Sequence, residues 1–346
     1  SDVVGTVTQA SLTTAGIVVV ARAYDGTRTA TINSTNYSFA GVFGSDAVVL
    51  DASNYGALYD TATASTSKSV TVSALALSGT DAANYTLVQP MLVGAINKAT
   101  ATVIFSTPLS VVYDATSRAV GTTTTPSALT VVVQYSGRGA TSFATSTTGP
   151  IDAGNYGVAA SINETNYLGT NAADFTIEKQ LLPVALETAA LTTTFTGRAR
   201  FVAATTMPLG KQVGVLYQGS GSTTYAASTY APTNAGTYAV TATIEERNFQ
   251  GTSTQTLTVA KANQETLSIV NTAPVVYGDT TTSLLAKGGT GNGAITYAKV
   301  SGPCTINSVT GAVLTTGVGS CVVRASKAAS DNVEAAVSAT RTLEIV

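Results

Sequence analysis

The sequence contains no histidine at all, and only 2 cysteines among its 346 residues. Without histidine the chain lacks the most common general base, the most common metal ligand and every catalytic triad built on that side chain. No closely paired acids, no Cys/His dyad and no serine elbow stand in for it. We therefore expect no enzyme, no catalytic residues, no metal site and no cofactor.

Charge is also scarce. Only 10% of the residues are charged and the net charge is −2, whereas an ordinary globular chain has roughly 25% charged residues. Lysine and arginine nowhere form a run, so the clustered cations that nucleic-acid binding needs are missing. The longest unbroken apolar run, residues 17–21, is far shorter than the ~18 residues of a membrane helix. We expect neither nucleic acid as a partner nor membrane insertion.

The start of the chain shows neither the basic segment nor the apolar segment of a signal peptide. Ser1 leads directly into strand-like sequence. We therefore expect a mature form or a segment of a longer protein.

Polarity comes from threonine, serine, asparagine and glycine. Threonine and valine favour the pleated, half-buried surface of a strand, while glycine and asparagine favour turns. Short strand patterns recur every 8–12 residues, and no amphipathic helix of useful length interrupts them. This pattern predicts an all-β chain built from β-sandwiches.

Internal repeats divide the chain. A strand pattern closed by lysine ends at Lys98, Lys179 and Lys261, at intervals of 81 and 82 residues. An aromatic marker near the start of each repeat keeps the same spacing after a slightly longer first repeat. These markers are Tyr24, Tyr113, Phe195 and Tyr277. Two markers with one period predict tandem modules, whose proposed bounds are 1–98, 99–179, 180–261 and 262–346.

A third marker is a turn that ends in tyrosine and precedes a strand. It ends at Tyr85 in the first module, Tyr156 in the second and Tyr238 in the third. Its position fits the tyrosine corner of immunoglobulin-like sandwiches, in which the phenol binds backbone a few residues upstream. The alternative is a tyrosine that stacks on a sugar, but repetition at one place in each module favours architecture.

The joints between modules contain no glycine/serine tract, so they should not act as flexible tethers. The lysine at each joint is expected to lay its stem along the joint and keep its ammonium in solvent. Isopeptide bonds between these lysines and asparagine remain an open alternative. We expect a stiff, elongated rod of immunoglobulin-like modules that is monomeric and whose partners include the neighbouring repeats of the same polypeptide.

The first module resembles the YDG domain of large bacterial haemagglutinin- and adhesin-type proteins. The residues that carry the resemblance are 24–27, 68–72 and 77–87. The second and third modules resemble the MBG-type bacterial immunoglobulin-like repeat. Their matching segments are 112–114, 152–156 and 166–169 in the second module, and 234–238 and 248–251 in the third.

The fourth module is similar to another bacterial immunoglobulin-like class, through residues 277–278, 288–297 and 301–304. Its segment 331–333 departs from that class, which usually has tyrosine nearby. Families of this kind imply secretion, tandem arrays and display on the cell surface, and they carry no catalytic residues.

That expected export gives the two cysteines a role. Cys304 and Cys321 lie 17 positions apart, and Cys321 occupies the place of Tyr238 one module earlier. In an oxidising exterior we expect a cross-strand disulfide that closes a short loop. Two unpaired buried thiols are the alternative.

Acidic and glycine-rich turns have ordinary explanations. Asp51, Asp81 and Asp152 each open an Asp-Ala-x-Asn-Tyr turn, where an aspartate commonly caps its own backbone, although a calcium site is an alternative. The glycine-rich segment 288–293 lacks the lysine of a phosphate-binding loop, and we interpret it as a hairpin turn.

The sequence therefore favours an extracellular stalk or spacer segment of a large bacterial surface adhesin, which projects an adhesive region from the cell. The alternative is that one module is itself a binding domain for a glycan or a protein, because the loops of a sandwich often bind ligands. The partner would then be a host or abiotic surface ligand or a glycan.

Overall fold

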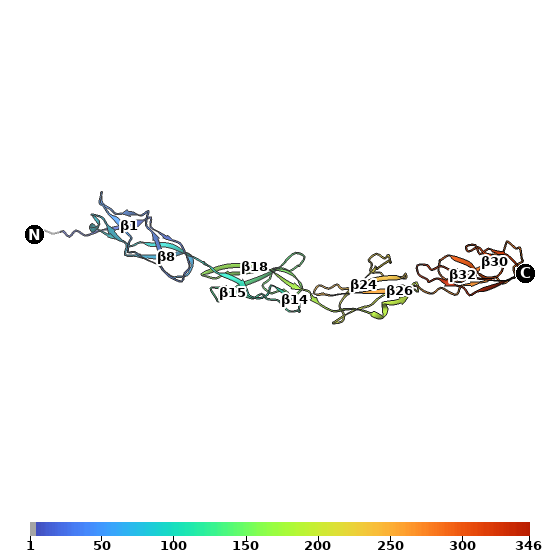
Figure 1. The fold of residues 1–346 in the computed structure, drawn as a ribbon. Helices are drawn as coiled ribbons and strands as arrows, with labels where there is room; N and C mark the ends of the chain where they lie inside the picture. The colour runs from blue at the N-terminus through green and yellow to red at the C-terminus, as the bar shows by residue number, and fades with distance from the viewer. Residues whose placement is uncertain (1–4) are drawn as a thin grey trace. The chain divides into compact units, whose positions relative to one another are not determined.

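The computed structural model describes residues 5–346, so the expectation about Ser1 lies outside the described residues. The chain divides into two compact units, one ending at Glu178 and the other beginning at Lys179. Both units are β structure, interrupted by two short 3₁₀ turns (Figure 1). Between residues 5 and 346 no helix has the length and apolarity needed to span a membrane. The predicted all-β class with immunoglobulin-like sandwiches is confirmed.

The first module contains one four-stranded sheet, in the order β3-β11-β8-β7, and three smaller sheets packed on it, β10-β1-β5, β2-β4 and β6-β9. Its elements are β1 (Ala10–Ala15), β2 (Val18–Val20), β3 (Arg22–Ala23), β4 (Thr31–Asn33), β5 (Ser38–Ala40), β6 (Val49–Asp51), β7 (Gly56–Tyr59), β8 (Ser65–Ser73), β9 (Ala76–Ser78), η1 (Ala82–Asn84), β10 (Tyr85–Leu87) and β11 (Met91–Asn97). Tyr59, Val70 and Ile96 are completely or almost completely buried between the sheets.

In the second module, β17 and β18 form a long hairpin at the centre of the sheet β12-β18-β17-β16, and β14 also pairs with β18. A smaller sheet, β13-β15, packs on it. The strands are β12 (Ala99–Thr100), β13 (Thr102–Phe105), β14 (Ser110–Val112), β15 (Thr122–Thr125), β16 (Val132–Gly137), β17 (Gly154–Asn163) and β18 (Tyr167–Glu178).

The second unit begins with a module of the same plan. Its main sheet has the order β21-β26-β24-β23, and the pairs β20-β22 and β19-β25 complete it. The elements are β19 (Gln180–Leu181), β20 (Val184–Leu186), η2 (Thr188–Ala190), β21 (Thr192–Thr194), β22 (Ala204–Thr206), β23 (Val213–Gly219), β24 (Gly236–Ile244), β25 (Phe249–Gln250) and β26 (Thr252–Ala260).

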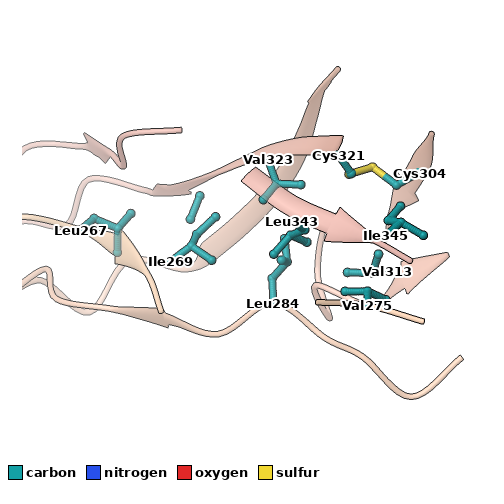
Figure 2. Packing of buried hydrophobic residues seen from close by; sticks show 11 residues of the cluster. Leu267, Ile269, Val275, Leu284, Cys304, Val313, Cys321, Val323, Leu343 and Ile345 are labelled. Atoms are coloured by element: carbon teal, nitrogen blue, oxygen red, sulfur yellow. A yellow bond between two sulfur atoms is a disulfide. The ribbon is translucent and has the colours of Figure 1, made fainter. Parts of the chain in front are cut away.

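The fourth module places its largest sheet around β32, which pairs with β29, β33 and β34, and adds the pairs β27-β28 and β30-β31. Its strands are β27 (Ser268–Ile269), β28 (Ala286–Lys287), β29 (Ile295–Ser301), β30 (Cys304–Ile306), β31 (Val313–Thr315), β32 (Gly319–Lys327), β33 (Ala336–Val337) and β34 (Arg341–Ile345). Figure 2 shows its buried cluster, with the disulfide at one end near Ile345 and Leu267 at the other.

One strand in each of the last three modules repeats the same core. In β24 the side chains of Tyr238, Val240 and Ala242 are buried, while the residues between them are more exposed. Alternation of this kind is the mark of a strand with one buried face. The corresponding triplets are Tyr156, Val158 and Ala160 in β17, and Cys321, Val323 and Ala325 in β32. The 82-residue period is therefore a period of core positions.

The glycine-rich segment 288–293 is not a hairpin turn. It leaves β28, which pairs with β27, and enters β29, which pairs with β32, so it connects two different sheets. Gly288 has a φ of 93°, and a Cβ there would lie 2.0 Å from the carbonyl oxygen of Thr266. Close backbone approach explains the glycine, which the sequence pattern alone could not distinguish from a tight turn.

Candidate functional site: the module joints

The joint between the first two modules is closed by an asparagine in the turn between β17 and β18. The carbonyl oxygen of Asn166 accepts from the amide of Ala99 at 2.8 Å, and its side-chain Oδ1 accepts from the amide of Ala64 at 2.9 Å. Ala64 belongs to the first module, 102 positions earlier in the chain. Asn166 therefore joins both the entering strand and the preceding module to its own turn.

Two further contacts close the same joint. Lys98 donates from Nζ to Oδ1 of Asn163 at 2.6 Å, and the rings of Tyr24 and Tyr167 meet edge to face with centroids 5.5 Å apart. The Lys98 contact is a hydrogen bond to the amide oxygen. An edge-to-face pair adds about 0.5–1.5 kcal/mol beyond its burial. The expected position of Lys98 at a joint agrees with this arrangement.

The joint between the third and fourth modules repeats the design. The carbonyl oxygen of Asn332 accepts from the amide of Ala262 at 3.0 Å, and its Oδ1 accepts from the amide of Ala235 at 2.8 Å. Its Nδ2 donates to Oδ1 of Asn234 at 3.2 Å, and Lys261 donates from Nζ to the carbonyl oxygen of Ser330 at 2.7 Å. Asn332 lies in the segment 331–333, for which the sequence predicted no structural role.

Lys179, the third lysine of the series, makes the matching contacts inside the second unit. Its Nζ donates to the carbonyl oxygen of Glu246 at 2.9 Å, and the amide of the following Gln180 donates to the carbonyl oxygen of Asn248 at the same distance. The lysine marker thus precedes a backbone bond to an asparagine turn in all three cases. The sequence showed the lysines and the asparagines, but their pairing requires the fold.

Two of the three predicted tyrosine corners have the expected geometry. Tyr156 and Tyr238 are 1% and 2% exposed, and their hydroxyls donate to the carbonyl oxygens of Asp152 at 2.6 Å and Asn234 at 2.8 Å. Burial, together with the neighbouring Tyr225, raises the pKa of Tyr238. Rings buried this deeply cannot stack on a sugar.

Tyr85 is different, and its prediction as a tyrosine corner is wrong. Its hydroxyl donates to the carboxylate of Asp46 at 2.6 Å and accepts from the amide of Phe43, rather than binding backbone just upstream. The hydrogen bond to Asp46 raises the pKa of Tyr85. The physical reason is that β10 lies in the segment between β8 and β11 and pairs with β1. In the MBG-type modules a short hairpin takes the place of this segment. Tyr85 therefore matches Tyr156 and Tyr238 in its sequence motif but not in its position in the fold.

Cys304 and Cys321 form a disulfide with Cα atoms 5.9 Å apart, and both residues are fully buried. The expected cross-strand bond is instead a bond between sheets, because β30 pairs with β31 whereas β32 belongs to the main sheet. In the third module, Tyr238 occupies the place of Cys321 and packs edge to face on Tyr225. The covalent bond thus replaces an aromatic contact.

Sequence reasoning missed a repeated turn beside the aromatic markers. Asp25 and Asp114 each accept from the amide and hydroxyl of the threonine two residues later. These bonds lower the pKa of both aspartates. An arginine pairs with each aspartate, Arg22 in the first module and Arg118 in the second. The recurrence of an arginine after 82 residues, at Arg118 and Arg200, is the feature of the sequence that could have indicated a repeated turn here.

The fourth module has this turn without the arginine. Bonds from the hydroxyl of Thr282 and from the hydroxyl and amide of Thr281 hold the pKa of Asp279 at about 2, below its usual 3.8. Because the folded-state pKa is lowered, the stabilising effect is present above about pH 4 and is lost as the pH falls towards 2. We expect an NMR titration of the Asp279 carboxyl to give a midpoint near 2. A midpoint near 3.8 would contradict the hydrogen bonds of this turn. Asp279→Asn is the control, because its side-chain oxygen can still accept these bonds but does not titrate.

The other predicted aspartates take separate roles. Asp51 accepts from the amide of Ser53 at 2.9 Å and so caps its own turn, whereas Asp81 accepts from the amide of Ala47 at 2.8 Å, far along the chain. The backbone oxygen of Asp152 accepts from Tyr156. Within residues 5–346 no three acidic or cysteine side chains converge as a metal site would require.

Comparison with solved structures returns other multidomain chains at low similarity. Immunoglobulin domains 1–5 of Sidekick-1 share 13% identity over 98% of this chain and 79% of that chain, with a TM-score of 0.31. Domains EC1–4 of Drosophila N-cadherin share 10% identity over 88% and 85%, with a TM-score of 0.26. The three N-terminal domains of the bacteriophage RB49 Hoc capsid protein share 12% over 72% and 99%, with a TM-score of 0.28.

No curated protein matches the chain significantly in sequence. Family models match most of it. The YDG domain model matches residues 8–91, and the MBG domain model matches residues 101–181 and again 184–263. Both are adhesion-type rather than catalytic domains, which fits a repeat region of a surface adhesin. The order predicted from the sequence is therefore confirmed, and the chain is a YDG domain followed by two MBG domains and a further module.

Proposed function

We propose that this chain is an extracellular spacer of a bacterial surface adhesin, which holds an adhesive region away from the cell. The observation that carries the proposal is the chemistry of the joints. Asn166 and Asn332 each hold the entering segment of their own module with the backbone carbonyl and the preceding module with the side chain. A flexible tether would need none of these contacts.

The neighbouring strands at the first joint leave little room for bending. Strand β11 ends at Asn97 and β12 begins at Ala99, so Lys98 alone separates them. Contacts at such a joint add stability to small modules, as in other repeat proteins. In a spacer built in this way, the position of one module fixes the position of the next. Neighbouring repeats of the same polypeptide are then its main partners, and we propose that the chain is monomeric.

The spacer proposal can be tested at the first joint with spin labels on exposed Ser67 and Ser127. We expect a narrow distribution of label distances in the full chain and a distinctly wider one in Asn166→Ala, because Ala64 and Asn166 lose their bond. Asn54→Ala is the matched control, since Asn54 is exposed and its side chain donates to the hydroxyl of the neighbouring Ser53. A broad distribution in the wild-type chain would contradict a stiff spacer.

One observation favours the alternative, a binding role for the third module. Phe201 and Tyr230 are 74% and 81% exposed, on segments joined by the bond from the Arg200 amide to the Pro232 carbonyl. One period earlier the second module has Ala119 and Thr148. Exposed aromatic rings that a sibling module lacks are typical of a binding surface.

Glycan and host-protein arrays probed with the whole chain distinguish the two functions. If the third module is adhesive, binding is retained in Asn166→Ala and lost in the double variant Phe201→Ser, Tyr230→Ser. If the chain is a spacer, neither array gives a signal that depends on these two rings.

A further inference from the structure

In each module a segment near the start pairs in parallel with the end of the last strand. In the second module β14 runs parallel to the end of β18, with Val112 opposite Glu178. In the third module β21 runs parallel to the end of β26, with Thr194 opposite Ala260. Both pairs continue in hydrogen bonds just outside the strands, such as Tyr113 N to Glu178 O at 2.9 Å.

The other two modules share this pairing in shorter form. In the first module β3 is parallel to the end of β11, and Tyr24 donates its amide to the carbonyl oxygen of Asn97 at 2.9 Å. In the fourth module the amide of Val275 donates to Glu344 O at 2.8 Å, and that of Tyr277 to Val346 O at 2.7 Å. The aromatic marker of every repeat therefore sits where the opening segment meets the closing strand.

Parallel pairing decides how a module responds to a pull on its two ends. The chain enters β14 at its N-terminal end and leaves β18 at its C-terminal end. A pull then slides the two strands past each other along their length and loads all their hydrogen bonds together. In an antiparallel hairpin pulled at its two open ends, the bonds would instead break one at a time. The observed arrangement is the resistant one.

An arginine holds the opening strand from its outer side. Arg118 donates from Nη2 to the carbonyl oxygen of Val112 at 3.1 Å and pairs with Asp114. Arg200 does the same to the carbonyl oxygen of Thr194 and to the hydroxyl of Thr196. The carbonyls on the free side of an edge strand would otherwise have only water as a partner. The arginines thus bind the end of the strand that a pull would displace.

We propose that these paired ends are shear clamps, so that each module bears tensile load and resists unfolding under it. The proposed spacer function enters only as the source of the force, because a tether between a cell and a surface is stretched. In the fourth module the clamp consists of three backbone bonds, from Val275 N to Glu344 O, from Val346 N to Val275 O and from Tyr277 N to Val346 O. Its disulfide keeps the segment from Cys304 to Cys321 from extending.

The test is single-molecule stretching of the full chain from its two ends. We expect four ruptures, each releasing on the order of 250 Å of chain at ~3.4 Å per residue. One of the four ruptures should lengthen by about 60 Å when a reductant opens the 17-residue loop. This change identifies the rupture of the fourth module.

The matched variants are Val111→Pro and Val112→Pro. The bonds on either side, from Thr176 N to Leu109 O and from Tyr113 N to Glu178 O, place the Val111 amide towards β18 and that of Val112 away from it. We expect Val111→Pro to lower the rupture force of the second module to about half and Val112→Pro to leave it nearly unchanged. Equal forces in both variants and the wild type would overturn the clamp.

A change in pulling direction tests the clamp even if Val111→Pro fails to fold. Attaching the load through a cysteine introduced at exposed Ala119, instead of at the N-terminus, applies force to β14 from its far end. We expect the second module then to open at about half the force or less, because its bonds break in sequence. The same force from both attachment points would refute shear. If the first joint is flexible but the clamp resists force, only the spacer proposal is contradicted.

Discussion

Replacing both cysteines, as Cys304→Ala with Cys321→Ala, should destabilise the fourth module by about 3 kcal/mol in the chain-entropy model. The loop that the disulfide closes has a sequence separation of 17, and the two sheets would lose their covalent link. Calorimetry of the full chain should show one transition shifted downwards. Hydrogen exchange should assign the change to residues 262–346.

The reduced wild-type chain is the control for this variant, because it keeps both sulfur atoms and loses only the bond between them. It should lose nearly as much stability as the double variant. Exchange rates in the other three modules should not change. A fourth module whose midpoint moves by less than a degree in both samples would mean that packing alone, including Val323 and Leu343 around the cysteines, holds the sheets together.

Tyr156→Phe should destabilise the second module by about 1–3 kcal/mol, because it removes the hydroxyl that donates to the carbonyl oxygen of Asp152 in a buried setting. For a module of this size, each kcal/mol corresponds to a shift of roughly 4–8 °C in the melting midpoint. The ring is kept, so its contacts with Phe143 and Phe175 should survive. Amide exchange along β17 would report the loss.

Tyr238→Phe is the companion variant in the third module and should behave alike, since its hydroxyl donates to Asn234 O. Tyr85→Phe is the contrasting control. It frees the carboxylate of Asp46, which can turn to solvent, so a smaller loss is expected there. If Tyr156→Phe melts at the wild-type temperature, the corner contributes nothing and the shared position of these tyrosines needs another explanation.

Much of the fold could be predicted from local pattern. The alternation of Val240 and Ala242 with threonines identifies a strand with one buried face, and the same residues recur one period away as Val158 and Ala160. Such patterns survive because burial acts on each strand separately. The scarcity of charge and the absence of histidine are likewise properties of composition that need no knowledge of the fold.

Pairings between distant residues could not be predicted. Asn166 and Ala64 are 102 positions apart, and nothing in the sequence of either segment indicates that the two residues bond. Tyr85 shows the opposite difficulty, because its motif copies that of Tyr156 while its strand lies in another sheet. Sequence similarity reports shared turn chemistry, whereas the partner of a side chain depends on which strands the chain brings beside it.

The amino-acid sequence by itself determined the repeat, the strand-rich class, the order of the YDG and MBG domains and the candidates for the joints. Only the tertiary structure decided that the disulfide crosses between sheets, that the asparagine turns reach back to the preceding module, and that in each module a segment near the start runs parallel to the end of the last strand. The physical reason is one of range. Burial and turn preferences act within a few residues, but a hydrogen bond between modules exists only once both have folded.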